Sequence, residues 1–217
     1  MSGILKNPVI SSMLRTAKLR SYPKGQTILF PEDFTAHLFI LKKGAVTMGD
    51  IDDQDYQKIL HIFGPPALFP MVSFSEDTVR VSWYYTALTD CEVYLLPYDT
   101  LKKRLASVEG GTARNLLLQQ LLKEVHELLV RVNSFNKTTS FDKLRAALEF
   151  LATHHTKTTT TSWQRVTIPI THQILAALTG LTRETVSITL RQMQEQKLVR
   201  YASAGKLYIN RTKLSRL

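Results

Sequence analysis

The 217-residue chain is long enough for one large domain or two small ones, each with a core that needs no disulfide or metal. Apolar residues make up 44% of it and charged residues 21%, which is ordinary globular usage and argues against disorder. There is no apolar run of about 18 residues, the length that a membrane helix needs. Lys6, Asn7 and Pro8 interrupt the region where a secretory signal would be apolar. We therefore expect a cytoplasmic protein without a membrane partner.

The charge is uneven along the chain. Twenty-eight Lys and Arg residues against 18 Asp and Glu leave a net charge of +10. After Glu149 only Glu184 and Glu195 are acidic, while lysine and arginine remain frequent. A basic segment of this kind is expected in a domain that contacts phosphates. Cys91 is the single cysteine, so a disulfide framework or an iron–sulfur cluster held by several cysteines of one chain is excluded, and we expect it in the core.

Short β-like segments fill the region from Tyr22 to Pro97. They are separated by Gly, Pro and Asp, as in HLFILKKG (37–44), AVTMGD (45–50) and CEVYLLP (91–97). The first of these is apolar at both odd and even positions, which predicts a strand buried on both faces. We expect a small barrel or roll. Proline lacks the N–H that a sheet requires, so GPPALFP (64–70) is predicted to be a shaped loop or short turn.

A helical period begins near Thr112. Five apolar residues recur at alternating three- and four-residue steps: Leu118, Leu121, Val125, Leu128 and Val132. This spacing is typical of a coiled-coil seam, so one hypothesis is a dimerisation helix. The alternative is an ordinary buried helix of a monomer, because two heptads are short for a coiled coil. Leu117, Leu122 and Leu129 are expected on a flanking face that would cover the β-rich module.

A second helix is predicted from Phe141 to about His155, with Ser140 as its N-cap. Its apolar face is formed by Leu144, Ala147, Leu148 and Leu151. The residues from Asn133 to Ser140 are expected to form a hinge between domains. The threonine-rich tract from Thr156 to Ser162 has nothing to bury and is predicted to be a loop.

Two helical patterns separated by a tight break occupy the segment from Ile170 to Val199. Thr171 is the expected cap of the first helix and Thr182 of the second, and Gly180 suits the positive φ of a sharp turn. The spacing is that of a helix-turn-helix. A helical hairpin inside a bundle has a similar pattern and is the alternative.

The first turn of the second helix favours DNA binding. Arg183 and Glu184 are expected to project from it, with Thr185 and Ser187 beside them. In a major groove an arginine can donate to guanine O6 and N7, a glutamate can accept from cytosine N4, and hydroxyls can bind phosphates. The segment from Leu198 to Asn210 predicts a β-hairpin wing with Ala204-Gly205 at its tip and Arg200, Lys206 and Arg211 nearby.

These segments resemble the cyclic-AMP receptor protein and fumarate–nitrate regulator superfamily. The matching stretches are YPKGQTILFPED, LFILKKGAV, FDKLRAALEFLA and THQILAALTGLTRETVSITLRQMQEQKLV. The resemblance implies an α+β fold with an N-terminal cyclic-nucleotide-binding-like β-roll, a long dimerisation helix and a C-terminal winged helix-turn-helix. We expect the β-roll sensor domain at 1–111, the dimerisation helix and hinge at 112–136, and the DNA-binding domain at 137–217.

The resemblance also implies roles for individual residues. Arg183 and Glu184 would contact bases, and Ser187 can also do so. Contacts to phosphate, or support of the recognition helix, are implied for Thr171, Gln173, Thr182 and Thr185, and we expect a further DNA contact from Lys206. Ile188 stands where the family often has arginine, so one contact is missing and the half-site should differ. The implied partners are a second copy of the chain, an inverted-repeat DNA site, RNA polymerase and a small-molecule effector.

The sequence does not identify that effector, and the cofactor is unknown. Cyclic-nucleotide binders of this superfamily have a glycine–glutamate pair and an arginine–serine pair, where this chain has Gly64-Pro65 and Val81-Ser82. Arg80 lies one residue early, and a one-residue shift in a strand turns a side chain to the other face. An apolar pocket does not stabilise a buried anion, so cyclic AMP is not expected.

Other sensing chemistry is weakly indicated. His37, His61 and His126 are each isolated, which favours structural roles over haem ligation, and no metal site is predicted. Six aromatic residues would line an effector pocket or fill the core of the roll: Phe63, Phe69, Phe74, Trp83, Tyr84 and Tyr85.

We find no nucleophile elbow or phosphate-binding glycine loop, and the nearest acid–base pair, Glu124 with His126, is not expected to converge, so an enzyme is not expected. The sequence predicts a homodimeric, sequence-specific DNA-binding transcription regulator. The alternative is an effector-binding or protein-interaction module whose winged helix docks a protein partner.

Overall fold

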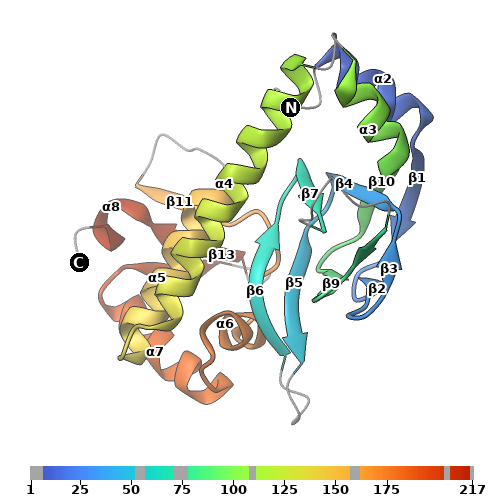
Figure 1. Ribbon diagram of the computed structural model, residues 1–217. Coiled ribbons are helices and arrows are strands. Elements are labelled where there is room, and N and C mark those ends of the chain that lie inside the picture. Colours follow the sequence, from blue (N-terminus) through green and yellow to red (C-terminus); the bar gives the residue numbers. More distant parts are fainter. Residues whose placement is uncertain are drawn as a thin grey trace. The chain divides into compact units, whose positions relative to one another are not determined.

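The computed structural model describes residues 7–51, 57–70, 78–107, 111–156, 162–202 and 206–215. The chain divides into two compact units, residues 1–49 with 62–127 and residues 50–61 with 128–217 (Figure 1). Within the described residues, no helix is long and apolar enough to cross a membrane.

The described residues of the first unit form antiparallel strands and three helices. In chain order its elements are α2 (Pro8–Thr16), β1 (Lys18–Tyr22), β2 (Thr27–Leu29), β3 (Phe34–Thr35), β4 (His37–Lys43), β5 (Val46–Ile51), β6 (Gln57–Phe63), β7 (Ala67–Phe69), β8 (Val79–Arg80), β9 (Tyr84–Ala87), β10 (Cys91–Pro97), α3 (Tyr98–Ala106) and α4 (Gly111–Phe135). Residues 50–51 of β5, 57–61 of β6 and 128–135 of α4 belong to the second unit. The strands form a sheet of order β1-β10-β4-β7, a second of order β2-β9-β5-β6 and the pair β3-β8.

Strand β4 is buried on both faces, as its apolar pattern predicts. Leu38, Phe39, Ile40 and Leu41 are all at most 5% exposed. β4 pairs with β10 on one side and β7 on the other, so it is a central strand. Cys91, at the start of β10, is buried as expected, and burial raises the pKa of its thiol.

Aromatic rings fill much of the roll. Phe69 stacks on Tyr85 with 5.1 Å between ring centroids, and on Phe39 and Phe63 at 5.5 and 5.9 Å. Phe63, Phe69 and Tyr85 are at most 2% exposed, so core packing accounts for them. Trp83 is 37% exposed and is not part of this core. Phe74 lies outside the described residues.

The centre of GPPALFP is a strand, which corrects the expectation of a loop or turn. Ala67–Phe69 forms β7 and pairs with residues 39–41 of β4. The prolines at 65, 66 and 70 lie outside this three-residue strand. Their missing N–H groups therefore do not interrupt its pairing.

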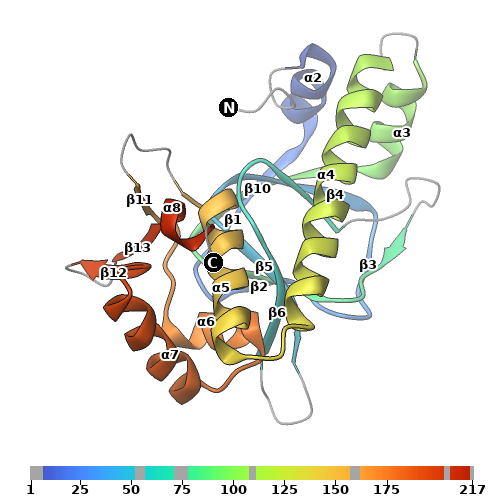
Figure 2. The same ribbon diagram turned by 90° about the vertical axis from the view of Figure 1, so that its left-hand side faces the viewer.

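The second unit consists of helices and a three-stranded sheet, which the reader can follow in Figure 2. Its elements are α5 (Ser140–His154), β11 (Trp163–Arg165), α6 (His172–Thr179), α7 (Arg183–Glu195), β12 (Val199–Ala202), β13 (Lys206–Asn210) and α8 (Arg211–Leu214). The sheet order is β11-β13-β12. The predicted apolar face of α5 is correct, because Leu144, Ala147, Leu148 and Leu151 are all 0% exposed.

Two predicted boundaries around α5 are wrong. Thr139, not Ser140, is the N-cap of α5, and its hydroxyl accepts a hydrogen bond from the N–H of Asp142 at 3.0 Å. Both residues have a capping hydroxyl, and Thr139 is the one with extended backbone. The hinge is also shorter than expected, since α4 continues to Phe135 and only residues 136–139 connect it to α5.

Candidate nucleic-acid interface

Helix α6 begins at the predicted cap. The Thr171 hydroxyl accepts a hydrogen bond from the N–H of Ile174 at 3.2 Å. Leu175 and Leu178 are 0% exposed, while Ile174 is half-buried. The first helix is therefore anchored by its apolar face and leaves Thr171 and Gln173 exposed.

A tight turn joins α6 to α7. Gly180 has a φ of +66°, in the left-handed region that glycine adopts without strain, and its N–H donates to the carbonyl of Ala176. Leu181 is half-buried, and Thr182 then caps α7 by accepting from the N–H of Thr185 at 3.2 Å. The two predicted caps and the predicted turn glycine are confirmed.

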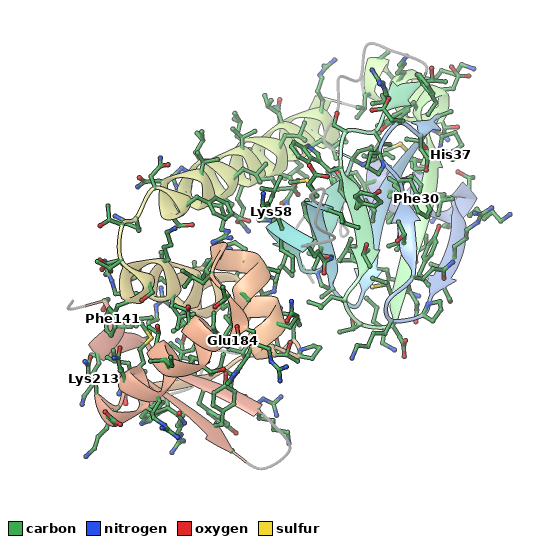
Figure 3. The ribbon with its side chains drawn as sticks, turned by 90° about the horizontal axis from the view of Figure 1, so that it is seen from below. Phe30, His37, Lys58, Phe141, Glu184 and Lys213 are labelled. Carbon is green, nitrogen blue, oxygen red and sulfur yellow. The ribbon has the colours of Figure 1, made fainter. Side chains whose placement is uncertain are left out.

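Helix α7 has one buried and one exposed face. Val186, Thr189, Leu190 and Met193 are at most 2% exposed. The exposed residues of the helix include Arg183, Glu184, Ile188, Arg191 and Gln192. The Glu184 side chain can be located in Figure 3. The first turn of α7 thus presents a cation and an anion side by side, as expected.

The hydroxyl of Ser187 is held within the protein. It donates to the carbonyl of Arg183 at 2.9 Å and lies 2.8 Å from Nδ1 of His172. The tautomer of His172 decides which of the two atoms donates in this second contact. Two contacts within the protein therefore restrict what the Ser187 hydroxyl can offer a base. His172, which also contacts the Tyr201 ring at 5.9 Å, is not among the residues we predicted.

The side chains of the other residues predicted to contact DNA differ in their exposure and in their hydrogen bonds within the protein. The hydroxyls of Thr182 and Thr185 lie 2.9 Å apart and bond to each other, which suits support of the helix more than contact with phosphate. Lys206 is exposed at the start of β13. The structure thus brings Arg183, Glu184 and Ser187 together on α7, while Lys206 lies on the sheet.

Strands β12 and β13 form the predicted wing. They pair antiparallel, with Arg200 opposite Tyr208, and the predicted tip at Ala204-Gly205 lies outside the described residues. The Arg200 guanidinium lies 4.7 Å from the Trp163 ring centroid and 5.0 Å from that of Tyr208. Trp163 is on β11, a strand that we did not predict. Cation–π contacts on both rings fix the orientation of Arg200 on the wing.

An apolar stripe runs along α4. In the single chain its members are between 43% and 63% exposed: Leu118, Leu122, Val125, Leu129 and Val132, here called the α4 stripe. The steps of four and three residues are those of a heptad seam. Leu122 and Leu129 belong to it, so the expectation that they cover the β-rich module is wrong. Leu121 and Leu128, which we expect in the seam, are half-buried in the single chain. Leu117 is buried, as expected of the flanking face.

Arg80 and Val81, at the place where we expect cyclic-nucleotide binders to have their arginine–serine pair, differ in exposure. Arg80 is 62% exposed and forms an ion pair with Glu32, while Val81 is 1% exposed. The described residues contain no group of three or more His, Cys, Asp or Glu side chains that could bind a metal.

A buried carboxylate was not predicted. Glu124 on α4 is 3% exposed, and its Oε1 accepts hydrogen bonds from Gln120 Nε2 at 2.7 Å and from the N–H of Leu68 at 3.5 Å. Its Oε2 is buried and has no hydrogen-bond partner among the described residues. Burial raises the pKa of Glu124 to about 7. His126 is exposed, so the two do not form an acid–base pair.

A β-roll, a long helix and a winged helix-turn-helix with an exposed Arg-Glu pair define a class of DNA-binding transcription regulators. Comparison with known proteins gives the same class. Residues 19–107 match the cyclic nucleotide-binding domain, and residues 144–217 match the Crp-like helix-turn-helix domain. Together these two matches cover most of the chain.

Whole-chain similarities extend across both units. The chain is 24% identical to the HTH-type transcriptional regulator ArcR of Staphylococcus epidermidis, over 83% of this chain and 77% of ArcR. It is 23% identical to the cAMP-activated global transcriptional regulator CRP of Haemophilus influenzae, over 89% of this chain and 85% of CRP. The structure of FixK2 from Bradyrhizobium japonicum has the same fold, with a TM-score of 0.76, 19% identity, and coverage of 93% and 96% of the two chains. The chain belongs to the CRP/FNR family of transcription regulators.

Proposed function

We propose that this regulator is a homodimer that recognises an inverted-repeat DNA site through α7. The observation that carries the proposal is the exposed first turn of α7, held by the caps at Thr171 and Thr182 and the turn at Gly180. Arg183 would donate to guanine and Glu184 would accept from cytosine N4. Ser187 would accept from a base donor, while Thr171, Gln173, Thr182, Thr185 and Lys206 would contact phosphate or support the helix.

The partners follow from this role. A second copy would pair through the α4 stripe, whose heptad spacing suits a two-stranded coiled coil. RNA polymerase would be a further partner, and the protein would act in the cytoplasm without enzymatic activity. A small effector would bind the β-roll. The exposure of Arg80 supports an effector other than a cyclic nucleotide.

Two single substitutions separate base recognition from electrostatic attraction. Arg183→Ala removes a bidentate guanine contact, so we expect it to cost about 1–3 kcal/mol on the selected operator and much less on random DNA. Lys206→Ala is the matched control, because an exposed lysine on the wing attracts every duplex equally. It should weaken all sequences alike and reduce the salt slope by about one unit.

Binding is measured by fluorescence anisotropy on the operator, on single-base variants and on random duplex across a salt series. Equal losses on all duplexes with Arg183→Ala would remove the assignment of α7 as the element that recognises bases. Salt-independent binding to a protein partner, with no DNA binding, would support a protein-docking role instead.

A further inference from the structure

An exposed apolar side chain lies on the outer face of the recognition helix. Ile188 is 64% exposed. Among the described residues that follow Val132 in the chain, it is the only large apolar residue that is exposed. A single exposed apolar residue is common on protein surfaces and does not by itself mark a contact. The position of Ile188 is the informative feature.

Ile188 lies at the centre of the face that α7 presents. It is two residues after Val186, about 200° around the helix axis, and so points opposite to that buried side chain. Glu184 lies one turn before it, and Gln192 one turn after it, and both are exposed. An apolar group therefore interrupts a row of polar ones, within the first two turns of the helix that enters a major groove.

The chemistry of the major groove restricts what an isoleucine can contact there. It has no donor or acceptor, so a purine N7, a guanine O6 or an amino group opposite it would lose water without gaining a hydrogen bond. The thymine C5 methyl is the apolar group that base pairs present in that groove. A β-branched side chain in a helix is also nearly fixed in χ1, so Ile188 is already ordered before binding.

We propose that Ile188 contacts the C5 methyl of a thymine in each half-site and so determines specificity for A·T at that position. This inference rests on the proposed function. Glu184 and Ile188 are one turn apart, a rise of about 6 Å, which corresponds to about two base pairs. The thymine therefore lies within about two base pairs of the base pair that Glu184 would contact.

Replacing thymine by deoxyuridine removes only this methyl group, and it tests the proposal directly. The full-length protein first selects an operator from a random-sequence duplex pool. Duplexes of the selected sequence are then made with one thymine at a time replaced by deoxyuridine, and their dissociation constants are measured by fluorescence anisotropy. We expect one position in each half-site to lose affinity about fourfold, the effect of exposing one methyl-sized group.

Three variants assign that loss to its side chain. Ile188→Ser should bind thymine and deoxyuridine duplexes equally at the sensitive position. Ile188→Val keeps a branched apolar group and should retain most of the difference in affinity between the thymine and deoxyuridine duplexes. Gln192→Ser, one turn further along the same face, is the matched control and should retain that difference fully.

Several results would overturn the proposal. One is a selected operator in which no thymine loses affinity when it is replaced by deoxyuridine. Another is a deoxyuridine effect that persists in Ile188→Ser. A third is a change of oligomeric state in Ile188→Ser, which would show that a second copy of the chain covers Ile188. The proposed function fails by a different result, namely no selected operator or no loss of discrimination with Arg183→Ala. If discrimination depends on Arg183 and no methyl effect exists, only the role of Ile188 is wrong.

Discussion

Arg131 is a buried cation that the second unit holds without an ion pair to any described carboxylate. It is 1% exposed, and its guanidinium donates to the carbonyls of Leu178 at 2.6 Å, Leu60 at 3.3 Å and Ile59 at 3.4 Å. Two aromatic rings, those of Phe135 and Phe150, lie 5.0 and 5.3 Å from it. Leu178 is in the last turn of α6, where the helix dipole favours a cation. Burial lowers the pKa of Arg131 to about 10, so it remains charged at neutral pH.

Arg131→Met should destabilise the second unit. Methionine has a similar length but no donors, so buried carbonyls lose their partners, and we expect a loss of about 3 kcal/mol in the free energy of unfolding. Arg131→Lys keeps the charge and should lose less. Urea denaturation of both variants measures the difference. A methionine variant as stable as the parent would mean that the hydrogen bonds of Arg131 contribute nothing net.

Glu124 should make the stability of the β-roll depend on pH. Its pKa rises from 4.5 to about 7 on folding, so between these values the folded state binds more protons than the unfolded chain. Stability therefore falls as pH rises through this window. Gln120, Lys123 and Glu127 on the same helix, and the N–H of Leu68, are the groups that influence it.

Glu124→Gln removes the titrating group, so this part of the pH dependence should disappear. Above neutral pH, where the parent holds a buried anion, the free energy of unfolding of the variant should exceed that of the parent by about 3 kcal/mol. Urea denaturation of both proteins from about pH 4 to about pH 8 covers the window. If the free energy of unfolding changed with pH equally in the two proteins, Glu124 would not titrate near neutral pH.

At the scale of elements, the α4 stripe carries the dimer prediction. Val125→Glu would bury an unpaired carboxylate at the centre of the seam and should cost several kcal/mol of dimer stability. His126→Glu is the matched control, because His126 is exposed next to Val125 but outside the stripe. Light scattering at micromolar concentration should find monomers only with Val125→Glu. If both variants remain dimeric, the two copies pair elsewhere.

Local sequence predicts elements well where the signal is local. Thr171, Gly180 and Thr182 were identified because a cap or a positive φ depends on a few neighbouring residues. Strand β11 was missed because three residues form a strand only by pairing with β13, which is distant in sequence. The short strand β7 was missed for the same reason, since its partner is β4.

The whole molecule determines the geometry of the DNA site. If two copies pair about a two-fold axis, their α7 helices should contact half-sites about 10 base pairs apart, in successive major grooves. Inserting about 5 base pairs between the half-sites would turn one of them to the opposite side of the duplex and should abolish tight binding. Inserting about 10 should restore part of it. Equal affinity for all spacings would indicate that one copy binds alone.

The sequence by itself determined the winged helix-turn-helix, because its caps, turn glycine and apolar period depend on residues close together in the chain. It also determined that Arg183 and Glu184 are exposed, since both lie in the first turn after a cap. Only the tertiary structure decided which side of α4 is exposed and placed Leu122 and Leu129 on it. The burial of Arg131 and Glu124 was decided there too. Burial depends on what packs against a helix, and residues far apart in the sequence supply that packing.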